Sequence, residues 1–235
     1  MLVTSLFAAV LLSTELPAGA LEGYASVLSV QVKEGRVAYA ALRDDRLAPL
    51  DAFLKAVAKA TPPADKSAAL AFYIDSYNAL VLRAVVTEGR PRSVLDVKGF
   101  FDGKIYEVAG KKVTLNQLEK EIILPLAKPD PRPHMVLVCG AVGCPVLERE
   151  PYSGSDLDAR LSAATRRYLA GPRGAQIEDG KIKLSKIFDW YQADFGGPAG
   201  VLTFVKKHLS PEALKRIGDA PKVEFIDYNW TLNQQ

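Results

Sequence analysis

The order of the predicted elements constrains this fold most, because helices predominate and the short strands do not alternate regularly with them. Apolar residues recur at helical spacing over residues 41–60, and a longer helix is predicted over 66–88. Asp65 is positioned to cap the longer helix, and Gly89 with Pro91 ends it. Further helices are predicted from the Thr114/Gln117 capping box through Leu126, at Asp156–Leu169, and in three segments that follow Ser185.

The predicted strands are few and short. Two hairpins are predicted, with turns at Ala109-Gly110 and Asp179-Gly180 and with strands at 105–108, 111–114, 177–178 and 181–184. His134–Cys139 is apolar and β-branched, so we expect a buried strand there, and Val223–Ile226 is expected to form another. The pattern predicts a single helix-rich α+β domain with a small, mostly antiparallel sheet, and it argues against a doubly wound sheet.

Composition and charge exclude several classes of protein. Of the 235 residues, 49% are hydrophobic and 24% charged, which is the balance of a globular chain and not of a disordered or collagen-like one. The net charge of +3 comes without a basic stripe, so no nucleic-acid partner is predicted. The sequence predicts neither a cofactor nor a conventional structural zinc site.

The first twenty residues resemble a signal peptide. An apolar run from Leu2 to Leu12 precedes Ala18-Gly19-Ala20, whose small residues suit cleavage after Ala20. The run is about half as long as a membrane span requires, so no stable span is expected after cleavage. We therefore expect an exported protein, periplasmic or extracellular, with residues 21–235 as its domain. The alternative is a buried N-terminal helix of a cytosolic protein.

The segment from His134 to Pro145 is the strongest candidate for chemistry. The expected strand delivers Cys139 to its C-terminal end, where Gly140 and Gly143 allow a tight turn with unshielded amides. Cys144 precedes a proline, and a helix starting there would lower the pKa of its thiol. His134 is five residues before Cys139, so on a regular strand the two side chains point to opposite faces.

Three other interpretations of this segment stay open. Cys139 and Cys144 are able to pair as a structural disulfide in an oxidising compartment, or both are inert buried groups. His134 is also compatible with a hydrogen-bonded core histidine. The five-residue separation of the thiols is not the spacing of a thioredoxin-like motif.

Three further segments carry candidate polar or aromatic groups. Asn78 lies among apolar residues of the helix over 66–88, so its amide is either a hydrogen-bonded staple or a group that faces a site. Asp194 is a possible acceptor for a histidine. The aromatic pair Tyr228 and Trp230 is expected to dock the C-terminal tail onto the core.

Six motifs in a fixed order resemble the domain of unknown function 547 (DUF547) family, over about residue 21 to the C-terminus. They are GRVAYAAL at 35–42, FYIDSYNAL at 72–80, VTLNQLEKEII at 113–123, HMVLVCGAVGCPVL at 134–147, LSKIFDWYQADFG at 184–196 and DYNWTLN at 227–233. The resemblance implies no settled activity, although fusions of family members to glutaredoxin-like or signalling modules hint at thiol chemistry or a binding role. Some branches of the family lack one or both thiols.

The sequence departs from the family pattern in two motifs. Tyr73 and Asp75 stand where Trp and Asn are usual, and Asn229 stands where Asp is usual. The two opposite exchanges of Asn and Asp suggest that Asp75 and Asn229 contact each other, with the amide of one bonded to the carboxylate of the other.

The leading interpretation is a thiol-dependent enzyme for acyl or thiol transfer or hydrolysis. In it Cys139 or Cys144 is the nucleophile, His134 is the base or orients it, and Asn78 with the loop amides polarises the substrate. The alternative is a non-catalytic module that binds a small molecule or a peptide, with the loop locked by a disulfide. A metal site made of His134, the cysteines and a carboxylate is a third, weaker option.

Overall fold

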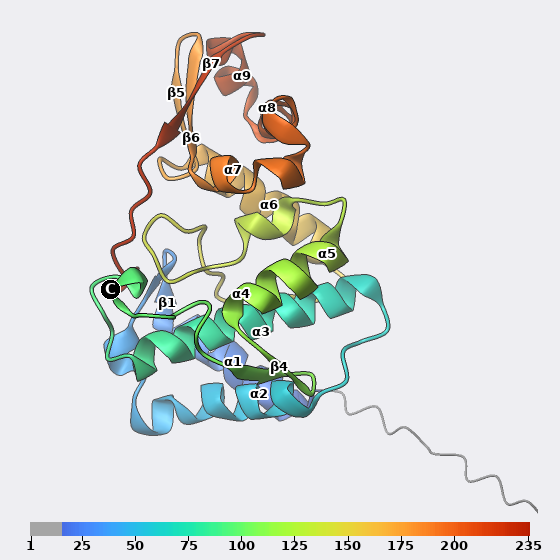
Figure 1. Cartoon of the computed structure of the whole chain (residues 1–235), viewed down its shortest axis with the longest axis vertical. Helices are drawn as coiled ribbons and strands as arrows, with labels where there is room; N and C mark the ends of the chain where they lie inside the picture. The colour runs from blue at the N-terminus through green and yellow to red at the C-terminus, as the bar shows by residue number, and fades with distance from the viewer. Residues whose placement is uncertain (1–15) are drawn as a thin grey trace, which may run out of the picture.

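The computed structural model describes residues 16–235, and it confirms the predicted helix-rich α+β class (Figure 1). The first half of the chain packs helices against one another, and the second half adds a small sheet with covering helices. The helices are α1 (Ala18–Gln31), α2 (Ala48–Lys59), α3 (Lys66–Thr87), α4 (Leu115–Gln117), α5 (Leu124–Ala127), α6 (Leu157–Ala170), α7 (Ile187–Trp190), α8 (Gly197–His208) and α9 (Pro211–Ile217).

The strands form small, mostly antiparallel sheets. Among the described residues β1 (Val32–Lys33) pairs with β2 (Arg36–Val37), and β3 (Tyr106–Val108) pairs with β4 (Lys111–Val113). The larger sheet has the order β5-β6-β7, made of Ala175–Glu178, Lys181–Ser185 and Lys222–Ile226. In that sheet β5 and β6 are antiparallel, whereas β6 and β7 are parallel.

Helix α3 is the centre of the first half of the molecule. The Asp65 carboxylate accepts a hydrogen bond of 2.8 Å from the backbone N–H of Ala68, so the predicted cap is confirmed. Nearly all of α3 from Ala69 to Val85 is buried. Its length and apolar character would suit a membrane span, but 89% of the qualifying segment is buried inside this protein, as expected of a core helix.

Two hydrophobic clusters meet in the middle of the molecule. The larger one surrounds α3, and the smaller one lies between the β5-β6-β7 sheet and helices α6, α7 and α8. Tyr228, which follows β7, packs against both clusters. In Figure 1 the chain after β7 runs back from the upper half to the lower half, where it ends.

The predicted strand over His134–Cys139 is wrong. Residues Arg132–Met135 form a 3-10 turn, and residues 136–139 belong to no strand. Their backbone partner is a side chain of α3, because Asn78 Nδ2 donates to Val136 O at 3.0 Å and Val138 N–H donates to Asn78 Oδ1 at 2.9 Å. Asn78 therefore takes the place of a strand, and its interpretation as a staple is confirmed.

Other local expectations also need correction. No helix starts at Cys144, since the chain from Pro145 to Glu148 is irregular, so no helix dipole acts on that thiol. The helix predicted over 41–60 begins only at Ala48, after a 3-10 turn at Asp44–Arg46. Most of the predicted signal peptide, residues 1–15, lies outside the described residues.

The predicted contact between Asp75 and Asn229 is wrong. Asp75 is buried in α3 and accepts a hydrogen bond of 2.8 Å from the backbone N–H of Tyr152. Asn229 is exposed, and its Oδ1 accepts from the backbone N–H of Thr231. Each side chain thus satisfies a nearby backbone group, and the two exchanges do not compensate each other.

The C-terminal tail closes over the cysteine loop. Val142 N–H donates to Thr231 O and Gly143 N–H to Asn229 O, both at 2.8 Å, and Asn233 N–H donates to Gly140 O at 2.9 Å. Gly140 has a φ of +88°, a conformation that L side chains rarely adopt. The backbone N–H groups of Val142 and Gly143 are therefore already bonded to the tail. They are not the free polarising donors that we expected.

Replacing Asn78 by Ala should lower the free energy of unfolding by roughly 2–4 kcal/mol, because Val136 O and Val138 N would be buried without partners. Urea denaturation measures the change. The matched control is Asn229→Ala, since that exposed side chain holds only one backbone group. Equal effects of the two substitutions would show that Asn78 is not the staple of this segment.

Candidate functional site

A cavity of about 320 Å³ lies where the two hydrophobic clusters meet. It collects residues from α3, from the turn after α4, from the His134–Cys139 segment, from α7 and from the tail. The lining residues are Tyr77, Phe101, Asn116, Glu119, Lys120, His134, Leu137, Cys139, Ile187, Trp190, Tyr191, Tyr228 and Trp230. We refer to this cavity as the His134 pocket.

His134 is paired with Asp194. The distance from Nε2 to Asp194 Oδ2 is 3.0 Å, which confirms that Asp194 accepts from a histidine. Burial lowers the pKa of His134 below 6.5, although the Asp194 hydrogen bond acts in the opposite direction. In the neutral ring Nε2–H donates to the carboxylate, so Nδ1 carries the lone pair. No described residue bonds Nδ1, and His134 is thus equipped to accept a proton in the pocket.

Glu119 supplies a buried carboxylate to the same pocket. It lies in a π-helical turn, Leu118–Ile123, between α4 and α5, and such turns are frequent at functional sites. Tyr191 donates its hydroxyl hydrogen bond to Glu119 Oε1. Burial, reinforced by the charge of Glu119, raises the pKa of Tyr77 and of Tyr191. Both hydroxyls therefore remain protonated donors.

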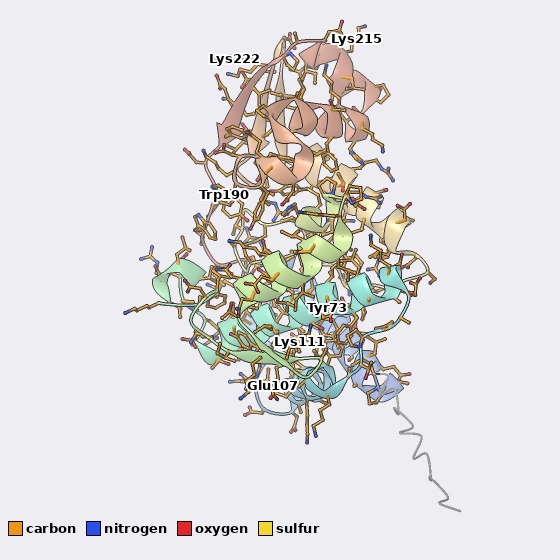
Figure 2. All side chains as sticks on the ribbon, turned by 45° about the vertical axis from the view of Figure 1, so that its right-hand side comes forward. Tyr73, Glu107, Lys111, Trp190, Lys215 and Lys222 are labelled. Atoms are coloured by element: carbon orange, nitrogen blue, oxygen red, sulfur yellow. A yellow bond between two sulfur atoms is a disulfide. The ribbon has the colours of Figure 1, made fainter. Side chains whose placement is uncertain are left out.

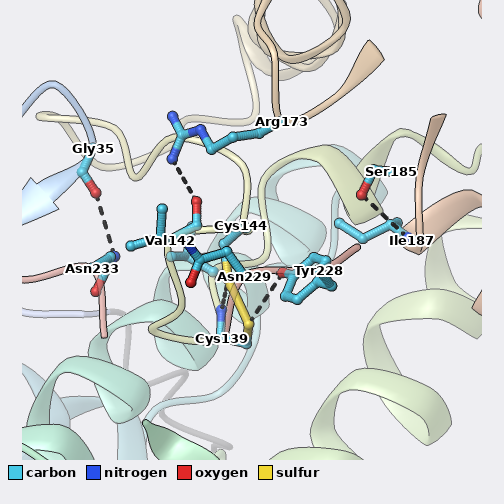
Figure 3. Close-up of a disulfide and its surroundings, with 12 residues drawn as sticks. Gly35, Cys139, Val142, Cys144, Arg173, Ser185, Ile187, Tyr228, Asn229 and Asn233 are labelled. Carbon is cyan, nitrogen blue, oxygen red and sulfur yellow. Dashed lines mark hydrogen bonds between the residues drawn. A yellow bond between two sulfur atoms is a disulfide. The ribbon is translucent and has the colours of Figure 1, made fainter. Parts of the chain in front are cut away.

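Cys139 and Cys144 form a disulfide beside the pocket, with their Cα atoms 6.4 Å apart (Figure 3). The two sulfurs differ in exposure, since Cys139 is half-buried and lines the pocket whereas Cys144 is 1% exposed. Cys144 Sγ accepts hydrogen bonds from the backbone N–H of Cys139 at 3.1 Å and from Tyr228 Oη at 3.3 Å. Tyr228 Oη also lies 3.5 Å from Cys139 Sγ. The disulfide is thus asymmetric in exposure, with one sulfur that faces the pocket and one buried sulfur that accepts two hydrogen bonds.

Aromatic rings form the outer wall of the pocket. Trp190 is 47% exposed and lies at the level where the two halves of the molecule meet (Figure 2). Its ring centroid is 4.9 Å from that of Tyr228 and 5.6 Å from that of Trp230. The expected docking of the tail through Tyr228 and Trp230 therefore also builds the wall of a cavity.

The structure brings together some of the predicted site residues and separates others. His134 and Cys139 line one pocket, because the absence of a regular strand removes the alternation that would have kept them apart. Cys144 is the buried partner of Cys139, and Asn78 is a staple that does not line the pocket. Among residues 16–235 no group of three or more His, Cys, Asp or Glu is arranged to hold a metal ion.

Sequence reasoning left some contributors to the pocket without a role. Glu119, Tyr191 and Trp190 line the pocket, and the sequence predicted no site role for them. Tyr228 was expected only to dock the tail. Its ring covers Gly143 so closely that a Cβ there would lie 3.0 Å from ring atoms, and this close approach explains the glycine.

Comparison with known proteins gives a family match over part of the chain and no activity. Residues 63–169 match the family model described as "Protein of unknown function, DUF547", which supports the resemblance that the motifs indicated. The match includes the motifs that carry Asn78, Glu119, His134 and both cysteines. No curated protein and no solved structure gives a significant match.

Because folding lowers the pKa of His134, the protein should become less stable as the pH decreases. The unfolded chain binds a proton near pH 6.5 and the folded chain only at lower pH, so the free energy of unfolding decreases as the pH falls below about 6.5. Denaturation of the wild type and of His134→Gln between pH 5 and 8 isolates this contribution, because His208 is present in both. Parallel pH profiles would contradict the assignment, and NMR titration of the His134 ring reads the same pKa directly.

Proposed function

We propose that this protein is a thiol-dependent enzyme in which thiols that enter the His134 pocket exchange with the Cys139–Cys144 disulfide. The single observation that carries the proposal is the asymmetry of the disulfide. Its approachable sulfur shares a cavity with a histidine–aspartate pair, and its other sulfur is buried and hydrogen-bonded. The closely related alternative of hydrolysis would need a free thiol, whereas exchange uses the disulfide as it stands.

The exchange reaction follows from this arrangement. His134 Nδ1 accepts the proton of an incoming thiol, and the thiolate attacks Cys139 Sγ. The S–S bond breaks and its electron pair goes to Cys144 Sγ, which leaves a mixed disulfide on Cys139 and a thiolate on Cys144. A second thiolate resolves the mixed disulfide. Overall two substrate thiols are oxidised to a disulfide and the protein disulfide is reduced to two thiols, and the reverse direction reduces a substrate disulfide.

Two groups favour departure of the Cys144 thiolate. The backbone N–H of Cys139 and the hydroxyl of Tyr228 both donate to Cys144 Sγ. Hydrogen bonds to an ionised acceptor are about twice as strong as those between neutral groups, so both bonds strengthen as negative charge develops on the sulfur. Burial raises the pKa of Tyr228, which keeps its hydroxyl protonated for this role.

A non-catalytic binding module is the second candidate function. It is favoured by the hydrogen bonds that tie the tail to the cysteine loop, because a disulfide inside such a loop also serves as a structural lock. In that case the pocket holds a small molecule or a peptide and the sulfurs do not react. The reactivity of Cys139 separates the two functions.

We also propose that the protein is exported and that residues 1–20 are removed. Disulfides persist in oxidising compartments, which agrees with a pairing of Cys139 and Cys144. Ala18 and Gly19 are exposed in the first turn of α1, and the core residues of that helix begin at Tyr24. Cleavage after Ala20 therefore leaves the buried face of α1 in place.

The two cysteines should differ sharply in reactivity when each is freed by substitution. In Cys144→Ser the thiol of Cys139 faces the pocket and should form a mixed disulfide with an aromatic disulfide reagent at least about tenfold faster than Cys144 does in Cys139→Ser. Stopped-flow absorbance measures both rates in folded protein. Equal rates, or an unreactive Cys139, would contradict the enzyme and leave the binding module.

Export predicts a defined mature terminus. Protein recovered from the cell envelope or the medium should begin at Leu21, as intact mass and N-terminal sequencing would show. Ala20→Trp should block processing, because a bulky side chain does not suit the small-residue position before the cut. Intact residues 1–20 on wild-type protein in the cytosolic fraction would refute the proposal.

A further inference from the structure

We infer that the His134 pocket recognises an ammonium group through Glu119, and that the thiols or disulfides which react at Cys139 carry such a group. This inference rests on the proposed thiol exchange and names its substrate class as small aminothiols and their disulfides. Glu119 and Cys139 line one cavity of about 320 Å³, which is enough space for a short aminothiol.

The first argument is the unpaired state of the Glu119 carboxylate. Glu119 is 8% exposed, and no ion pair within residues 16–235 involves it, although twelve ion pairs occur elsewhere in that part of the chain. Its hydrogen-bond partners are two neutral hydroxyls, those of Tyr191 and Tyr77. Burying a carboxylate without a cation is costly, and a bound ammonium would offset that cost.

The second argument is the aromatic character of the surrounding wall. Tyr77, Tyr191, Trp190 and Trp230 line the pocket together with Glu119. The faces of such rings attract cations, and the attraction grows when the cation is removed from water. A carboxylate inside an aromatic wall is thus suited to an ammonium group and unsuited to an anion.

The charges around the pocket agree with this preference. Besides Glu119, the charged residues there are Lys120, which lines the pocket, and Asp194, which is hydrogen-bonded to the neutral ring of His134. Lys120 is exposed, so water and salt screen its charge, whereas the charge of buried Glu119 is screened much less. The inner part of the pocket therefore favours a cation despite the neighbouring lysine.

The test compares reduction of the Cys139–Cys144 disulfide by cysteamine, 2-mercaptoethanol and 3-mercaptopropionate. Each rate is divided by the rate of the same thiol with a small reference disulfide, which cancels differences in thiolate fraction. Normalised rates should fall in the order given, with cysteamine about tenfold ahead of 2-mercaptoethanol, as expected for one charged hydrogen bond. In Glu119→Gln, which retains an acceptor for Tyr191, this ratio should fall to near one.

The matched control is Glu121→Gln. Glu121 lies in the same π-helical turn but is exposed and does not line the pocket, so its substitution should preserve the cysteamine preference. A second readout, quenching of Trp fluorescence by n-propylammonium against sodium at equal ionic strength, reports binding without thiol chemistry. Quenching should saturate in the wild type and disappear in Glu119→Gln.

The outcomes separate this inference from the proposed function. Equal normalised rates for the three thiols in the wild type would overturn the ammonium site and leave thiol exchange standing. If no thiol reduces the disulfide in folded protein but n-propylammonium binds through Glu119, thiol exchange fails and the ammonium site is supported. Absence of both reduction and binding would overturn both.

Discussion

The pairing of Asn78 with the backbone of Val136 and Val138 is the interaction on which the rest of the site depends. A strand could have satisfied these backbone groups only by imposing side-chain alternation on the segment. The amide of a core helix satisfies them instead, at 3.0 and 2.9 Å, and leaves the segment free to turn. As a result, His134 and Cys139 reach one pocket although an odd number of residues separates them.

The pocket combines groups that stabilise different charges. Burial keeps His134 neutral, and its bond to Asp194 selects the tautomer that leaves Nδ1 as a base. Hydrogen bonds to Cys144 Sγ suit the thiolate that the proposed exchange would form there. The carboxylate of Glu119 suits a cation that a substrate brings. In the proposed exchange, separate groups would therefore accept the proton, stabilise the departing thiolate and bind the substrate.

The sequence predicted the elements whose signals are local. Asp65 caps α3 within one turn, and the hairpin turn at Ala109-Gly110 uses two residues with positive φ. Prediction from the sequence failed where the deciding contact is distant in the chain. The partner of the Val136 and Val138 backbone is the side chain of Asn78, about 60 residues away. His134 and Asp194 are also 60 residues apart, so the sequence offered Asp194 only as a candidate acceptor for a histidine. The placement of Glu119 in the pocket depends on a π-helical turn, which hydrophobic periodicity does not predict.

The central claim is that the pocket-facing sulfur of the disulfide is the one that reacts. Brief treatment of folded wild-type protein with a limiting amount of cysteamine, acid quenching and peptide mass mapping would locate the first adduct. The account predicts a mixed disulfide on Cys139 and a free thiol on Cys144. An adduct on Cys144, or a disulfide that reacts only after the protein unfolds, would contradict it.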